Sequence, residues 1–185
     1  DWRESYYFNF VDLDNGVSGF TTIGLLPNLG KREFVFILFH PDGREVYYVE
    51  PEGPVTVDFL KSLSNGTLEY ALVDPLKEWT IKFAGERLTA DLRWKARFPP
   101  CDFGSGSETS WSGHFEQSGH VNGTVGLPSG HRMAIKGLGQ RDKSWGPRDW
   151  HIDSWYALHA QFDTHSIALR RDVVKDAAHV SGAIS

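Results

Sequence analysis

Short runs of alternating apolar and polar residues fill most of the chain and limit the folds that it can adopt. In the first run, Tyr6, Phe8 and Phe10 fall on one face of a strand, and Tyr7 and Asn9 fall on the other. About a dozen such runs, separated by turn-forming residues, have the spacing of antiparallel sandwiches and barrels. We therefore predict an all-β, antiparallel fold. The predicted strands are residues 6–11, 19–26, 33–40, 44–49, 55–60, 67–73, 78–83, 88–98, 111–117, 120–125, 131–136, 150–162 and 166–170.

The remaining segments are predicted to be turns, a loop and one stretch with some helical character. Asn65-Gly66 and Asn122-Gly123 are dipeptides typical of tight hairpins. Residues 99–108 (PPCDFGSGSE) indicate a long loop, either a lid over a site or a surface connection. Residues 171–178 are the one stretch with some helical character, and it is short and polar.

Several strands are apolar on both faces, as in residues 33–40 (EFVFILFH). Half-solvated antiparallel strands do not have this composition, whereas a barrel strand faces a lumen on one side and a packing layer on the other. The 7 Trp, 6 Tyr and 12 Phe also need enclosed apolar surroundings. A lipocalin-like (calycin-like) barrel with a cavity for a hydrophobic small molecule is therefore predicted. A strongly curved sandwich with a dry core is the alternative that periodicity leaves open.

Composition excludes several classes of partner. The net charge of −5 and the scattered basic residues argue against nucleic acid. A single cysteine, Cys101, allows no internal disulfide and no cysteine-based zinc site. No apolar run approaches the roughly 20 residues of a transmembrane helix, and no signal peptide is visible. We expect a soluble protein, with the cytoplasm slightly favoured. The chain begins at Asp1 rather than Met, which is compatible with a leader or another segment upstream of Asp1.

The histidines do not form a recognisable metal motif. His114 and His120 are six residues apart with Ser118-Gly119 between them, which allows a ligand pair across a hairpin. Solvent-facing histidines are the more common outcome of such a pattern. No nucleophile elbow, phosphate loop or dinucleotide fingerprint is present either. We therefore predict no metal and no cofactor.

Acidic residues near aromatic rings are the better catalytic candidates. Glu116 is flanked by Trp111 and Phe115, and a carboxyl group in aromatic surroundings often has a raised pKa and donates a proton. An exposed strand end is the alternative. Asp149 and His151 alternate with apolar residues, so a strand would place them on one face, where they suit acid–base chemistry or form a solvated surface.

Residues 137–150 (GLGQRDKSWGPRDW) combine glycine, proline, two Arg-Asp pairs and two tryptophans. Gly146-Pro147 is expected to interrupt the strand, so that Arg141 and Arg148 turn toward the same region. Guanidinium groups that are partly buried among tryptophans are costly unless they are paired with carboxylates. A structural clasp built on Arg141 and Arg148 explains this composition, and a segment that lines a site is the alternative.

The same segment supports a resemblance to a known family. The pattern G-x-G-x-R-D-x-S-W-G-x-R-D-W, preceded by the HFEQ strand of residues 114–117 and the N-terminal W-x-E-S-Y-Y-F, resembles the lipocalin-like family that includes hydroxyneurosporene synthase and AttH-type proteins. The resemblance implies two consecutive barrel-like halves with the motif near their junction, although only 35 residues follow Trp150. Residues 1–136 are then a lipocalin-like domain. Residues 137–185 either close that domain or start a second barrel, and the chain forms a homodimer or pairs with a second half.

Family members with assigned activities include hydratases of lipophilic alkenes. The resemblance thus implies a cofactor-independent hydratase or isomerase of the lyase class, acting on a terpenoid-like or aromatic alkene. Asp142 or Glu116 is the expected acid, and Asp149 with His151 is expected to orient water. The aromatic residues predicted to line the ligand cavity are Trp145, Trp150, Trp155, Tyr156, Phe115 and Trp111. A non-catalytic carrier of a hydrophobic ligand is the main alternative, and an interaction module is a third.

Overall fold

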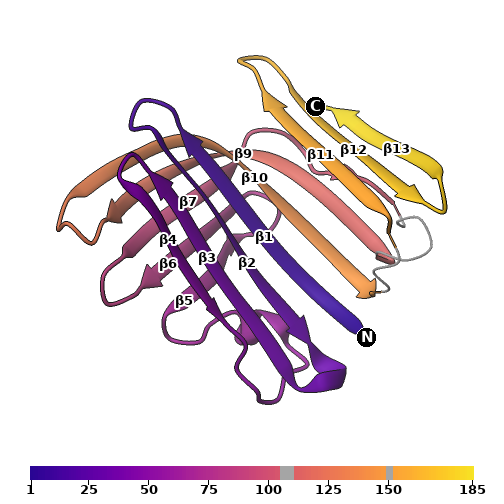
Figure 1. The fold of residues 1–185 in the computed structure, drawn as a ribbon, viewed down its shortest axis with the longest axis horizontal. Helices are drawn as coiled ribbons and strands as arrows, with labels where there is room; N and C mark the ends of the chain where they lie inside the picture. Colours follow the sequence, from indigo (N-terminus) through magenta and orange to yellow (C-terminus); the bar gives the residue numbers. More distant parts are fainter. Residues whose placement is uncertain (105–110, 149–151) are drawn as a thin grey trace.

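The computed structural model describes residues 1–104, 111–148 and 152–185 (Figure 1). These residues form thirteen strands and two short 3₁₀-helices, η1 (Pro27–Leu29) and η2 (Phe59–Ser62), which confirms the all-β prediction. No helix among them is long and apolar enough to cross a membrane. The strands are β1 (Trp2–Asp12), β2 (Val17–Leu26), β3 (Lys31–His40), β4 (Gly43–Val49), β5 (Leu68–Asp74), β6 (Glu78–Ala84), β7 (Thr89–Ala96), β8 (Cys101–Asp102), β9 (Gly113–Gly126), β10 (Arg132–Pro147), β11 (Ser154–Gln161), β12 (Ser166–Val174) and β13 (Ala177–Ile184).

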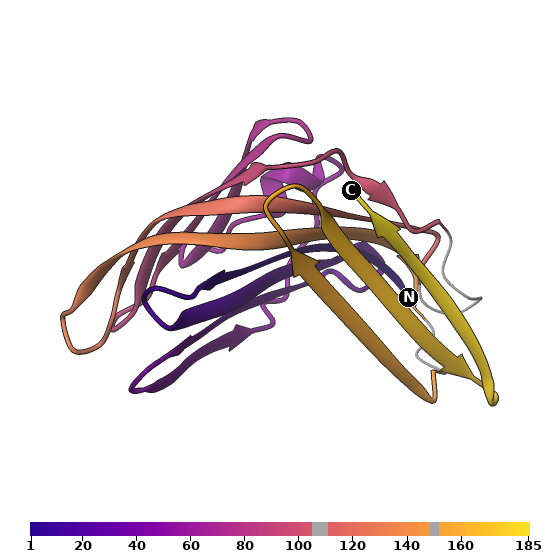
Figure 2. The ribbon, with the colours of Figure 1, turned by 90° about the horizontal axis from the view of Figure 1, so that it is seen from above.

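The strands belong to two antiparallel sheets. The larger sheet has ten strands in the order β4-β3-β2-β1-β10-β9-β7-β6-β5, with the short β8 added beside β9. It is strongly curled into a half-barrel, as the arch in Figure 2 shows. The smaller sheet, β11-β12-β13, lies against the larger one at the C-terminal end of the chain (Figures 1 and 2).

Aromatic side chains fill the concave face of the half-barrel. Phe36 on β3 stacks on Phe83 on β6 with ring centroids 4.6 Å apart, although these strands are far apart in the sheet order. Tyr47 on β4 meets the same ring edge-on at 5.1 Å. The curl therefore brings the two ends of the sheet together across one hydrophobic core.

Alternation along β1 decides which residues enter this core. Tyr6, Phe8 and Phe10 are buried in it, as the sequence pattern predicts, and the Phe8 ring contacts Trp94, which is fully buried. Each such side chain stabilises the fold by about 1.5–3 kcal/mol. Tyr7 and Asn9 are half-buried on the opposite face. That opposite face carries the candidate site.

Two predicted elements are wrong because their local signals were weak. Residues 55–60 are not a strand, since they form a loop that enters η2. Residues 171–178 are not helical: β12 ends at Val174, and Lys175 and Asp176 turn the chain with φ of 49° and 64° into β13. This polar segment is extended because β12 pairs with β13, and the polar composition of the segment did not indicate that pairing.

Glycine-containing pairs also misled the turn predictions. Asn122-Gly123 lies inside β9, which joins the two strands predicted at residues 111–117 and 120–125. Gly123 has φ of 151°, and a Cβ there would lie 2.0 Å from the Asp91 carbonyl oxygen, so this glycine permits close strand approach. Gly146 likewise pairs with Arg3 on β1 instead of interrupting the strand.

The domain division predicted after residue 136 falls within β10, and the assignment of domains stays a prediction. In the predicted loop of residues 99–108, Cys101 and Asp102 pair with β9 as β8. The rest of that segment from residue 105 onward lies outside the described residues.

Candidate functional site

The smaller sheet packs on the face of β9 and β10 that points away from the core. Gln161 on β11 donates a hydrogen bond from Nε2 to the Gly139 carbonyl oxygen at 2.7 Å. Arg97 donates to Gln161 Oε1 at 3.0 Å and to the carbonyl oxygens of Phe162 and Asp163 at 2.8 and 3.0 Å. These bonds fix the smaller sheet over a polar strip.

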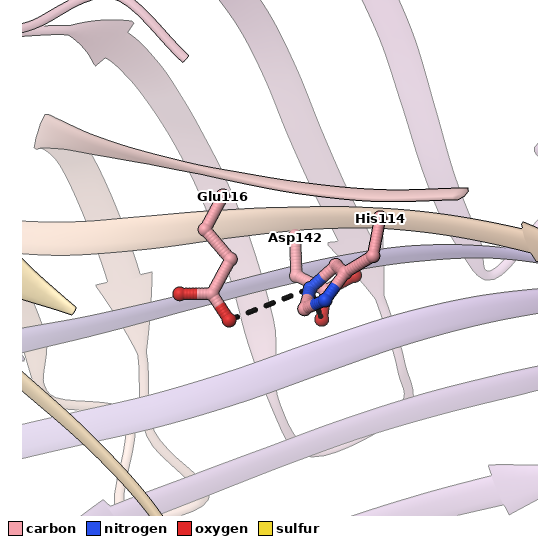
Figure 3. Close-up of side chains that lie close together, drawn as sticks. All are labelled: His114, Glu116 and Asp142. Carbon is pink, nitrogen blue, oxygen red and sulfur yellow. Dashed lines mark hydrogen bonds and ion pairs between the residues drawn. The ribbon is translucent and has the colours of Figure 1, made fainter. Parts of the chain in front are cut away.

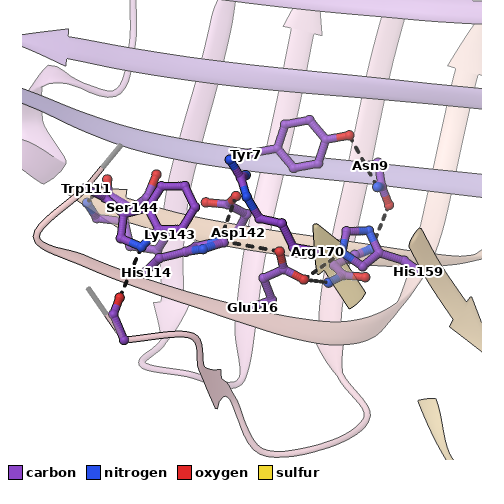
Figure 4. A network of polar contacts seen from close by, with 12 residues as sticks. Tyr7, Asn9, Trp111, His114, Glu116, Asp142, Lys143, Ser144, His159 and Arg170 are labelled. Atoms are coloured by element: carbon purple, nitrogen blue, oxygen red, sulfur yellow. Dashed lines mark hydrogen bonds and ion pairs between the residues drawn. The ribbon is translucent and has the colours of Figure 1, made fainter. Parts of the chain in front are cut away.

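Four side chains in this strip form what we call the histidine–carboxylate cluster: His114, Glu116, Asp142 and His159. His114 Nε2 lies 3.0 Å from Asp142 Oδ2 and 3.4 Å from Glu116 Oε1 (Figure 3). Glu116 Oε2 lies 2.6 Å from His159 Nε2 and accepts a hydrogen bond from Gln140 Nε2 at 2.5 Å (Figure 4). Carboxylates and imidazoles thus alternate along one connected chain.

Strand register explains why these residues meet. Glu116 on β9 is paired with Asp142 on β10, and His114 is paired with Ser144. Because side chains alternate between faces, His114 and Glu116 share one face with Asp142. His159 joins them from β11 on the smaller sheet.

Burial makes the hydrogen bonds of the cluster necessary. His114 is 2 % exposed and Glu116 is 5 % exposed. A buried carboxylate is costly unless it is paired, and the described partners of Glu116 are two histidines and an amide. Each carboxylate–imidazole contact is a hydrogen bond only when one proton lies between the two groups. The cluster is therefore a connected path along which a proton can move between Asp142 and His159.

Ligand atoms of His114, Glu116 and Asp142 also lie within 4.8 Å of one another, a spacing within reach of a small cation. His114 Nε2 contacts both carboxylates, while His114 Nδ1 and Asp142 Oδ1 are buried without a hydrogen-bond partner among the described residues.

Asp142 connects the cluster to a cleft of about 550 Å³. Its side chain is 29 % exposed. Trp111 and Trp155 line the same cleft, and the Arg170 guanidinium lies 4.3 Å from the Trp111 ring and 5.3 Å from the Trp155 ring. A carboxylate, aromatic faces and cations thus surround one open space.

Tyr7 lines this cleft and a second cavity of about 330 Å³, which Gln140 and His159 also line. Burial raises the pKa of the Tyr7 phenol, and the nearby carboxylates of Asp142 and Glu116 raise it further, against the lowering effect of the Asn9 side chain. Tyr7 therefore keeps its proton at neutral pH. Its hydroxyl accepts a hydrogen bond from Asn9 Nδ2 at 3.3 Å.

The two arginines of the predicted clasp lie on opposite sides of the larger sheet. Arg141 points to the core face, where its guanidinium lies 4.8–5.7 Å from the rings of Trp79, Trp94 and Phe115. Arg148 lines the cleft and donates to Ser144 Oγ at 3.1 Å. The expectation that both turn toward one region is wrong, because β10 continues to Pro147. A clasp between Arg148 and a carboxylate stays a prediction.

The aromatic residues predicted to line the ligand site also lie on opposite faces of the larger sheet. Trp111 and Trp155 line the cleft beside Asp142, as predicted for a ligand site, while Phe115 and Trp145 line a different cavity on the core side. Tyr156 is exposed. The predicted residues Asp149, Trp150 and His151 lie outside the described residues.

Two expectations about single residues need correction. Glu116 is bound by histidines and Gln140, whereas the sequence suggested aromatic surroundings. His114 and His120 belong to the same strand and do not face each other across a hairpin. The role of His114 beside Glu116 was not predicted, although their spacing of two residues on a strand indicates a shared face. The contribution of His159 had no such local signal.

The fold resembles two solved structures. A putative AttH from Nitrosomonas europaea has a TM-score of 0.71 at 13% sequence identity, with 99% of this chain and 64% of that chain covered. Kievitone hydratase from Nectria haematococca has a TM-score of 0.72 at 12% identity, with 98% and 60% covered. The chain thus spans less than two thirds of either protein. At these identities the likeness shows the lipocalin-like fold, and a specific relation to hydroxyneurosporene synthase stays a prediction.

Comparison with curated proteins gives no match. A family model described as "Domain of unknown function (DUF7064)" matches residues 1–183, nearly the entire chain. The chain therefore belongs to the DUF7064 family.

Proposed function

We propose that the protein adds water to a carbon–carbon double bond of a lipophilic aromatic or terpenoid-like molecule held in the cleft beside Asp142. One observation carries the proposal: Asp142 contacts His114, which leads through buried Glu116 to half-buried His159, while the Asp142 carboxyl group borders a cleft that Trp111 and Trp155 also line. The fold-level likeness to a kievitone hydratase supports the same reaction class.

In the proposed reaction, protonated Asp142 gives its proton to one alkene carbon. The π electrons form the new C–H bond and leave a positive charge on the neighbouring carbon. The Asp142 carboxylate, which is ionised once it has given up its proton, lies beside this charge and stabilises it by electrostatic attraction. A water molecule then donates a lone pair to form the C–O bond. The proton that it loses returns to Asp142 through the cluster, so that alkene and water give an alcohol and the acid is regenerated.

The cluster suits this cycle because it holds the returning proton. His114 Nε2 lies between two carboxylates, so the ring can take up the proton that water loses and pass it to Asp142. Glu116 in turn is held by His159 and Gln140. General acid–base groups of this kind typically contribute 10²–10⁴-fold to a rate.

A non-catalytic carrier is the second candidate. It is favoured by the separate cavity of about 600 Å³ lined by Phe115 and Trp145, which lies away from the cluster. A carrier needs an apolar cavity but no acid.

Asp142→Asn separates these candidates, because the amide keeps the shape of the side chain and cannot deliver the proton. We expect turnover to fall by about 10²–10⁴-fold with the circular dichroism spectrum unchanged. Turnover is measured by liquid chromatography and mass spectrometry on a panel of aromatic and terpenoid alkenes that begins with kievitone.

The matched control is Asp91→Asn, an exposed aspartate on β7 of the same sheet, which should leave turnover unchanged. Turnover by Asp142→Asn at the wild-type rate would refute the role of this acid. Binding of panel compounds by wild-type protein without any turnover would favour the carrier.

A further inference from the structure

The core face of β10 carries a buried cation that the proposed reaction does not use. Arg141 is 5 % exposed, and its Nε and Nη1 atoms are buried without a hydrogen-bond partner in the described part of the chain. Burial lowers the pKa of the Arg141 guanidinium to about 10, so the group remains charged at neutral pH. Buried donors of a charged group are normally satisfied, so an acceptor is expected here.

Other unpartnered donors lie around the same guanidinium. The indole Nε1 atoms of Trp79 and Trp94 are buried and have no partner among the described residues. The Arg141 guanidinium carbon lies 5.5 Å from the Trp79 ring centre and 5.7 Å from that of Trp94. Gln117, which is paired with Arg141 on β9, has one unpartnered acceptor atom, Oε1. A single acceptor cannot satisfy the donors of Arg141, Trp79 and Trp94.

The nearby carboxylates are already engaged. Asp142 points to the opposite face and contacts His114. Glu4, on the core face, accepts hydrogen bonds from Lys143 Nζ at 2.5 Å and Trp2 Nε1 at 2.7 Å. The described protein thus supplies Arg141 with donors as neighbours and no paired carboxylate.

A cavity of about 600 Å³ with a mainly apolar lining lies beside this group, and Asp102 and Ser112 supply its polar side chains. Phe115 and Trp145 form part of its wall, together with Leu76 and Pro100. The Arg141 guanidinium lies 4.8 Å from the centre of the Phe115 ring, so the cation and the cavity share that side chain. Apolar pockets with a few converging polar groups are the usual form of small-molecule sites.

We propose that the core face binds a lipophilic carboxylic acid. Its carboxylate accepts hydrogen bonds from the Arg141 guanidinium and from the indole N–H groups of Trp79 and Trp94, and its apolar body occupies the cavity beside Phe115. An anion supplies both the countercharge and the acceptors that the described residues lack. This site lies on the opposite face of β10 from Asp142 and does not depend on the proposed hydration.

The test uses two ligands of matched shape, 1-naphthylacetate and the neutral 1-naphthylacetamide, titrated by calorimetry at neutral pH. We expect the wild-type protein to bind the acid at least about tenfold more tightly than the amide, because charge-assisted hydrogen bonds favour the carboxylate. Arg141→Met should remove this preference. Met replaces the aliphatic stem of Arg141 without the buried charge, so the variant is expected to fold.

The matched control is Arg132→Met, an exposed arginine on the same strand, which should keep the full preference. If Arg141→Met does not fold, Trp79→Phe and Trp94→Phe provide the readout: each keeps a smaller aromatic ring, loses the N–H donor and should weaken acid binding several-fold. Equal binding of acid and amide to wild-type protein would overturn the proposal, as would binding of neither compound. Unchanged acid binding in Arg141→Met, or in both tryptophan variants, would also overturn it.

Discussion

At the residue scale, the alternation of strand β10 gives neighbouring residues different chemistry. Asp142 joins the histidine–carboxylate cluster on one face, while Arg141 is enclosed by aromatic rings on the other. Aromatic neighbours in the sequence identified Glu116 as a candidate acid, and the resemblance to a family with hydratases added Asp142. It could not identify His159, because the contact with Glu116 spans 43 residues and depends on how two sheets pack.

Asp12 provides a residue-scale prediction about acid stability. It is 1 % exposed, and its carboxylate accepts hydrogen bonds from the Lys136 backbone N–H at 2.9 Å and from the Asn15 side chain at 2.8 Å. Burial acts to raise the pKa of Asp12, but these hydrogen bonds to the charged form outweigh it and lower the pKa below 3.8. The resulting stabilisation is present above the unfolded-state pKa and is lost as the pH falls through the folded-state pKa.

We therefore expect Asp12→Asn to lower the free energy of unfolding by about 1–3 kcal/mol at neutral pH, with the difference from wild type shrinking in acid. Urea unfolding at neutral pH and near pH 3 measures both values. Asp14→Asn in the same turn, where the side chain is exposed, is the control. A difference that stays constant between the two pH values would contradict the role of the ionised carboxylate.

At the element scale, strand existence was predictable and strand ends were not. Runs such as β1 and β3 show their alternation or apolar character directly, and both were predicted. Residues 137–147 contain turn-forming glycine and proline, yet they belong to a central strand, because close backbone neighbours require glycine. A Cβ at Gly146 would lie 2.3 Å from the Ser112 nitrogen. Such contacts come from residues far along the sequence, so no local pattern reveals them.

The docking of β11 and β12 on the larger sheet gives an element-scale prediction. Arg97 donates hydrogen bonds to Gln161 and to the turn after it, and Gln161 itself bonds to β10. Arg97→Met should release this end of the smaller sheet. Amide hydrogen exchange in residues 154–174 should then accelerate, while exchange in β1 and β3 remains at the wild-type rate. Arg44→Met on the exposed β4 is the control. Unchanged exchange in residues 154–174 of Arg97→Met would show that other contacts hold the smaller sheet.

At the scale of the whole molecule, the curled antiparallel sheet was predictable from its many alternating strands, but the position of the site was not. The sequence favoured a site within the barrel cavity. Aromatic side chains fill much of the concave face, and the cluster lies on the other face, beneath the smaller sheet. Only the packing of the two sheets decides this. Pairing with a second copy or a second barrel half stays a prediction.

The central claim is that this cluster adds water across a double bond, and isotopic labelling tests it most directly. Wild-type protein and Asp142→Asn are incubated with the alkene panel in deuterium oxide that also carries heavy oxygen, and the products are analysed by mass spectrometry and nuclear magnetic resonance. We expect a wild-type product with heavy oxygen on one former alkene carbon and deuterium on its neighbour, and little of it from Asp142→Asn. No labelled product from wild-type protein, or equal amounts from both proteins, would rule out hydration by this cluster.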